Sequence, residues 1–188
     1  MKTKDQLADK FSGPSSLLYQ SAALVITESE GVKSFTASPE LDVPCKVDSL
    51  NFEQGKAEVE EYKVIGLSGA WITDSEPGDI DLGFRVPSIS EDILKLAFGA
   101  DAVSEITASV DNVDYEGLAL ILKNKKVQGT WMIVNSAKDR IMIINNTALF
   151  ASLVLDSDAK GVIAVDFNGS IETDGTNPDV IFLKKKTN

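Results

Sequence analysis

The sequence has no histidine and a single cysteine, Cys45, in 188 residues. Without histidine the chain cannot build a Ser-His-Asp or Cys-His catalytic arrangement, a histidine-ligated zinc site or a histidine general base. One cysteine can form neither an intramolecular disulfide nor a thiolate metal cluster, so the cytoplasm is the simpler compartment to expect, while export stays open. We therefore expect a protein without catalytic residues, metal or cofactor.

Basic residues are scarce as well. The chain has 18 Lys and Arg against 29 Asp and Glu, a formal net charge of -11. Binding nucleic acid by neutralising phosphates needs clustered Lys and Arg, so that class of protein is excluded. The two small basic groups, Lys123 with Lys125 and Lys126 and the run 184–186, are expected to be solvated.

Long apolar runs are missing too. No stretch approaches the length that spans a bilayer, and acidic residues interrupt the basic start of the chain, unlike in a signal peptide. The 43% hydrophobic content is ordinary for a folded domain. Residues 1–20 show weak periodicity around Gly13 and Pro14, which predicts a flexible N-terminal arm before a single domain over residues 21–188.

The most informative segment changes hydrophobic period without a linker. Residues 80–86 alternate apolar and polar side chains, which predicts a half-buried strand. Ser88 and Glu91 have capping-box spacing, and the apolar positions that follow recur at helical spacing up to Gly99, a C-terminal cap. We therefore expect one amphipathic helix over about residues 88–98, lying on a sheet.

Most other segments have the composition of strands and turns. The segment around 54–56 is expected to be the tip of a hairpin. Near the C-terminus, the alternating run 163–171 is followed by a turn at 173–175 and a returning strand at 180–183. Regular short strands of this kind predict a mainly β protein, an antiparallel β-sandwich or barrel with one short flanking α-helix.

Several motifs have a catalytic or binding interpretation beside a structural one. Ser68 lies in a faint nucleophile elbow that has no histidine to activate it. Asp79 with Asp81 could serve a glycosidase, as could Glu58 with Glu60, although carboxylates two residues apart are the ordinary polar half of an amphipathic strand. An enzyme of this kind is therefore the weakest of the hypotheses.

The distribution of these features favours an assembly subunit. A flexible arm and a mixed-charge strand leading to a hairpin tip are natural partner contacts. Identical subunits that close into a ring form heterologous contacts, and stacked rings make an open tube. Acidic faces turned into such a tube would repel DNA phosphates and let a duplex slide without sticking.

Two segments resemble the major tail tube proteins of phages. The strand-to-helix passage is similar in Gly78 to Leu94, and the closing hairpin is similar in the run from Val165 to Ile171 with its returning strand. The resemblance implies a β-sandwich related to the type VI secretion tube protein, hexameric rings and a stacked tube. It also implies a bacterial host cytoplasm during assembly and then a virion tail. The partners would be the chain itself, other tail components and DNA that passes without specific binding, with no membrane.

The same resemblance implies that the hairpin around residues 52–63 bridges neighbouring subunits. Its candidate contact residues are Phe52, Glu53, Gln54, Lys56, Glu58, Glu60 and Tyr62. The alternative is a monomeric β-sandwich module that recognises carbohydrate or protein through its loops. Its aromatic anchors would be Trp71 and Trp131, although tryptophans on alternating strands usually lie in the core.

Overall fold

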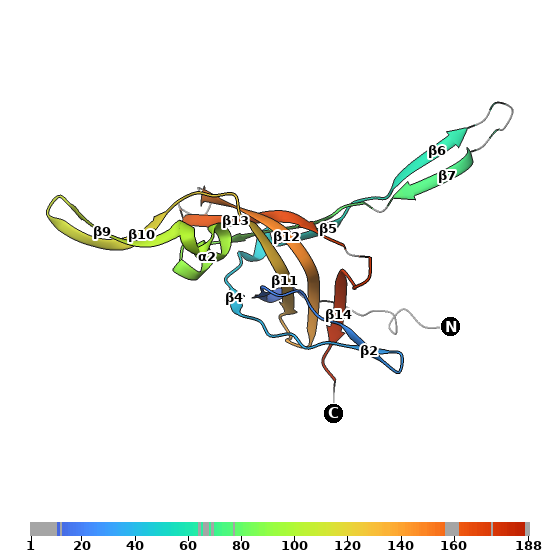
Figure 1. Ribbon diagram of the computed structural model, residues 1–188, viewed down its shortest axis with the longest axis horizontal. Coiled ribbons are helices and arrows are strands. Elements are labelled where there is room, and N and C mark those ends of the chain that lie inside the picture. The colour runs from blue at the N-terminus through green and yellow to red at the C-terminus, as the bar shows by residue number, and fades with distance from the viewer. Residues whose placement is uncertain are drawn as a thin grey trace.

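The computed structural model describes residues 11, 13–63, 65, 68, 70–76, 78–156, 162–173 and 175–186. It is mainly β with one α-helix, which confirms the predicted fold class (Figure 1). The elements are β1 (Pro14–Gln20), β2 (Thr27–Ser29), β3 (Val32–Ser34), β4 (Leu41–Val43), η1 (Val47–Ser49), β5 (Asn51–Gln54), β6 (Glu58–Lys63), β7 (Ala70–Glu76), β8 (Ile80–Val86), α2 (Glu91–Phe98), η2 (Ala100–Ala102), β9 (Val103–Val110), β10 (Val113–Leu120), β11 (Lys126–Asn135), β12 (Arg140–Asp156), β13 (Val162–Ile171) and β14 (Val180–Lys184).

An antiparallel sheet of eight strands forms the body of the protein. Its order is β4-β1-β11-β12-β13-β8-β5, and β14 pairs with β12. The 17-residue strand β12 is long enough to pair with β13 over residues 147–156 and with β14 over residues 140–144. β14 is therefore no hairpin partner of β13, which corrects the predicted closing hairpin.

The sheet curls because the chain joins its two edge strands. After β4 at one edge, the segment through η1 crosses to β5 at the other. Two hydrogen bonds attach this crossing to β8: Lys46 N donates to Arg85 O at 2.9 Å, and Arg85 N donates to Ser49 Oγ at 2.9 Å. The curled sheet thereby wraps one side of the core.

The main core is aromatic and centres on Trp131, which has no exposed surface. Its ring centroid lies 4.7 Å from those of Tyr19 and Phe84 and 6.1 Å from that of Phe167. These side chains come from β1, β8, β11 and β13, so this one cluster joins both halves of the sheet. Trp131 is thus a core residue, which removes it as an aromatic anchor of the binding-module alternative.

Helix α2 covers this core, as the change of period predicts. Ile93, Leu96 and Ala97 are buried, and Gly99 ends the helix at a φ of 107°, in the left-handed region. The predicted capping box is wrong, because the helix begins at Glu91 with Ser90 as its N-cap, and Ser90 makes no capping side-chain hydrogen bond.

A smaller core lies on the other face of the sheet. Leu24, Met132 and Ile143 form it, and the segment that contains β2 and β3 covers it. β1 contributes to the sheet between β4 and β11, with Leu17 and Tyr19 buried. The predicted flexible arm is therefore wrong for residues 14–20, and residues 1–10 of that arm lie outside the described part of the chain.

Gly169 lies where the backbone of β13 passes close to that of β12, so a larger residue at this position is expected to destabilise the fold. A Cβ at this position would clash with the carbonyl oxygen of Ala148 and approach Leu149 Cα to 2.9 Å. Gly169→Ala is expected to lower the free energy of unfolding by about 1–3 kcal/mol, the usual cost of overpacking. The matched control is Gly117→Ala, because nothing lies within 4 Å of a Cβ there. Urea unfolding that shows equal stability for the two variants would contradict this account of β13.

Candidate assembly surfaces

Two ribbons project from opposite sides of the body (Figure 1). We call residues 51–86 the long arm, in which β5 pairs with β8 and β6 pairs with β7. We call residues 103–120 the short arm, in which β9 pairs with β10. The pairs β6–β7 and β9–β10 each form a separate two-stranded sheet. Within the described residues, neither of these two pairs is hydrogen-bonded as a strand to the sheet of the body, whereas β5 and β8 at the root of the long arm belong to that sheet.

The long arm extends beyond the turn that the sequence predicts. Gly55 N donates to Asp79 O at 2.7 Å, so the ribbon continues through residues 54–56 instead of turning back there. The two backbones approach so closely at this point that a Cβ on Gly78 would lie 2.6 Å from Lys56 O. Glycine is required at this crossing, and the predicted hairpin tip is wrong: the two strands are joined between Lys63 and Ala70.

The predicted contact residues fall on different parts of the long arm. Phe52 is half-buried at its root and packs against the main core, so replacing it would disturb folding as well as assembly. Glu53, Gln54 and Lys56 are exposed. The remaining predicted contacts lie on β6, and their side chains lie outside what the structure describes: Glu58, Glu60 and Tyr62. The side chain of Trp71, on β7, lies outside it as well.

The short arm is fixed firmly at its root. Asp101 precedes β9 and Lys123 follows β10, and the Lys123 Nζ lies 2.6 Å from Asp101 Oδ2. This hydrogen bond and the ammonium charge lower the pKa of the Asp101 carboxyl. Lys125 Nζ donates to the carbonyls of Lys95 and Leu96 at the end of α2. The basic loop, predicted only to be solvated, thus anchors the short arm to the helix.

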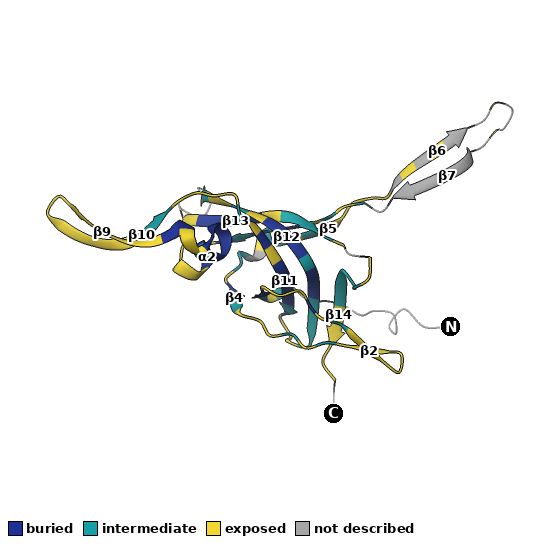
Figure 2. Cartoon of the chain, viewed as in Figure 1, coloured by how far each residue is buried: buried dark blue, intermediate teal, exposed yellow. Residues whose placement is uncertain are grey.

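The two faces of the short arm differ in chemistry. Opposed residues of an antiparallel pair share a face, so the register puts Ile106, Val110, Val113 and Tyr115 together. These four side chains are 50–56% exposed. The opposite face carries carboxylates, and Figure 2 shows the ribbon exposed almost along its full length. An amphipathic strand pair normally buries its apolar face, and no described part of the chain covers this one.

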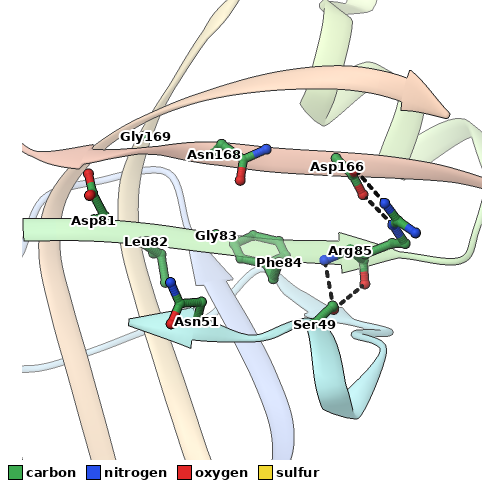
Figure 3. A pocket seen from close by; sticks show the side chains of 10 residues that line it. All are labelled: Ser49, Asn51, Asp81, Leu82, Gly83, Phe84, Arg85, Asp166, Asn168 and Gly169. Carbon is green, nitrogen blue, oxygen red and sulfur yellow. Dashed lines mark hydrogen bonds and ion pairs between the residues drawn. The ribbon is translucent and has the colours of Figure 1, made fainter. Parts of the chain in front are cut away.

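A polar hollow lies between η1, β8 and β13 (Figure 3). Arg85 and Asp166 form a bidentate pair there, with Nε to Oδ1 at 2.6 Å and Nη2 to Oδ2 at 2.8 Å. Asp81 also lines the hollow, whereas Asp79, its predicted partner in a carboxylate pair, does not. The Arg85–Asp166 pair joins opposed residues of the neighbouring strands β8 and β13, so these two charges already satisfy each other within the sheet.

Cys45 lies half-buried on the segment that crosses between the two edge strands. Burial raises the pKa of its thiol more than the hydrogen bonds with Ser49 and Arg85 lower it. Because the thiolate is the reactive form, we expect the folded protein at neutral pH to react with a disulfide reagent more slowly than the denatured chain. A measured rate in the folded protein equal to that in denaturant would contradict this placement of Cys45.

Among the described residues, no three His, Cys, Asp or Glu side chains gather in a way that could hold a metal ion, and no helix has the length and apolarity to cross a membrane. No model of a known protein family matches the chain, and no curated protein matches it in sequence. The two projecting arms are therefore the features from which a function is argued.

Proposed function

We propose that this protein is the structural subunit of a phage-tail-like tube and assembles into stacked rings around a central channel. The observation that supports this best is the pair of arms on opposite sides of the body (Figure 1). Two-stranded ribbons on their own are marginally stable in water. A chain that carries two of them gains most when neighbouring molecules pack against both.

The partner that fits the arms is a second copy of the chain. The apolar face of the short arm is too exposed for an isolated monomer, and such faces mark interaction sites. Arms that reach away from the body in two directions contact two different neighbours. Such contacts are heterologous, so they generate closed rings or open stacks. The long arm, which reaches furthest, would bridge neighbouring subunits.

The charge of the chain suits a channel for DNA. With a net charge of -11, a ring of subunits would surround its channel with negative potential. Such a wall repels phosphates, so a duplex would pass without specific binding. The chain would need no catalytic group, cofactor or metal for this function.

The proposal is tested by the mass of the purified protein across a concentration series, measured by light scattering and by crosslinking. The tube proposal predicts that mass rises with concentration towards closed oligomers. The alternative, a monomeric module that binds carbohydrate or protein, predicts a constant monomer mass. A monomer at every concentration, together with a tryptophan fluorescence response to added glycans, would favour that alternative.

A further inference from the structure

We propose that the short arm of one copy binds the basic end of the next copy, and this inference rests on the proposed self-assembly. The basic end is the tip of β14 with the neighbouring β11–β12 turn. Its residues are Lys138, Phe182, Leu183, Lys184, Lys185 and Lys186. The contact would join an acidic ribbon with one apolar face to a basic surface that contains exposed apolar side chains.

The basic end offers an apolar surface edged with lysine. Leu183 is 38% exposed and shares a face of the sheet with Ile141, whereas Phe182, 69% exposed, lies on the opposite face. A groove opens beside Leu183, lined by Ile141 and Leu183, with Lys138, Asp139, Lys184 and Lys185 around it. The backbone there is held in place, because Lys185 N donates to Asp139 O at 2.8 Å. The groove is therefore a formed surface that could take an apolar side chain such as that of Tyr115.

Charge selects this surface over a second exposed apolar patch, at the end of β12 and β13. The short arm has four acidic residues and no lysine or arginine, whereas residues 180–186 have three lysines and no acid. The other patch, Leu153, Leu155, Val162 and Ile163 at the end of β12 and β13, is joined by residues 156–160, which carry two aspartates and one lysine. An acidic ribbon is attracted to the first surface and repelled by the second.

The acids do not have to touch the lysines directly. Glu105, Asp114 and Glu116 lie on the face of the ribbon opposite Ile106 and Tyr115, about one sheet thickness from a surface on which the apolar face rests. The Debye length is about 10 Å at 0.1 M salt, so the attraction persists across the ribbon there and fades at higher salt. The apolar face then supplies the contact area, and the charges select the partner surface.

The placement of the two surfaces makes the contact intermolecular. The short arm and β14 lie at well-separated positions along the protein (Figure 1). Each copy therefore presents its short arm to one neighbour and its basic end to another. This head-to-tail contact repeats from copy to copy, as a ring requires.

A charge exchange tests the contact. Variant A carries Glu105→Lys, Asp114→Lys and Glu116→Lys on the acidic face of the short arm, and variant B carries Lys184→Glu, Lys185→Glu and Lys186→Glu. In A both contact surfaces are basic, and in B both are acidic. Each alone should need about tenfold more protein for half-assembly at low salt, a factor that corresponds to roughly 1.4 kcal/mol, because several like charges then repel each other across the thickness of the ribbon. An equimolar mixture should assemble like the wild type, because every A–B contact joins opposite charges.

The control is Glu28→Lys with Glu30→Lys, which reverses charges in the same direction as variant A but on the exposed β2–β3 hairpin. It should assemble like the wild type, and circular dichroism should show all variants folded. The inference is overturned if A and B each assemble like the wild type, or if their mixture assembles no better than either alone. If the contact is overturned in this way but the wild-type protein still forms rings, the proposed tube stands. If the wild-type protein is a monomer at every concentration, both the contact and the tube are overturned. Head-to-tail oligomers of the wild type without a channel would overturn only the tube.

Discussion

Trp131→Ala is expected to lower the free energy of unfolding by about 3–5 kcal/mol, the usual cost of truncating a fully buried large aromatic residue. Trp131 has no exposed surface and contacts the rings of Tyr19, Phe84 and Phe167. Its truncation would leave a cavity between β1, β8, β11 and β13, the strands that hold the two halves of the sheet together. Most small domains are stable by only about 5–15 kcal/mol, so the variant would be close to unfolding.

The measurement is urea unfolding followed by circular dichroism, because the substitution removes a fluorescent reporter. Trp131→Phe is the matched control, since it keeps an aromatic ring and should cost clearly less. The indole N–H of Trp131 has no hydrogen-bond partner, so phenylalanine loses no polar contact there. A loss below about 1 kcal/mol for the alanine variant would contradict the placement of Trp131 at the centre of the core.

Replacing residues 57–77 with a two-residue Asn-Gly turn is expected to abolish the stacking of rings while the body stays folded. The change removes β6 and β7, which pair only with each other. It keeps β5, β8 and Phe52, which belong to the body and its core. Because Gly55 N already bonds to Asp79 O, the strands lie close enough at this point for a short turn to join them.

The outcome is measured as the mass of the assemblies in sedimentation velocity, with thermal unfolding as the check on folding. The midpoint temperature should change little, since β6 and β7 pair with each other in a sheet separate from that of the body. A control that shortens the β2–β3 hairpin by removing residues 28–33 should leave assembly intact. Stacked assemblies of normal length from the variant without β6 and β7 would exclude a bridging role for the long arm.

The pattern of apolar residues predicts a helix or strand correctly where the pattern lies within that one element. The alternation over residues 80–86 and the helical spacing after it identify β8 and α2, because each pattern reflects which side of a single element is buried. The sequence pattern puts the N-cap of α2 at Ser88, two residues before the observed N-cap at Ser90. Serine is an acceptable N-cap at either position, and only the backbone conformation distinguishes them. β1 was missed because it lies between two strands, and its sequence, PSSLLYQ, does not alternate.

Pairing between distant segments could not be predicted in the same way. Alternation in residues 180–183 identifies a strand but does not show that its neighbour is β12 rather than β13. At Gly55 the sequence signals a turn, yet glycine there serves a close crossing of two backbones. Alternation in the short arm indicates a ribbon with one apolar face, and only the structure shows that this face stays exposed beside the described segments of the chain.

The measurement that tests the central claim most directly is negative-stain electron microscopy of the purified wild-type protein across a concentration series. The account predicts rings, and stacked rings at higher concentration, each with a central channel. Uniform single particles without a channel at every concentration, from protein that circular dichroism shows to be folded, would contradict it.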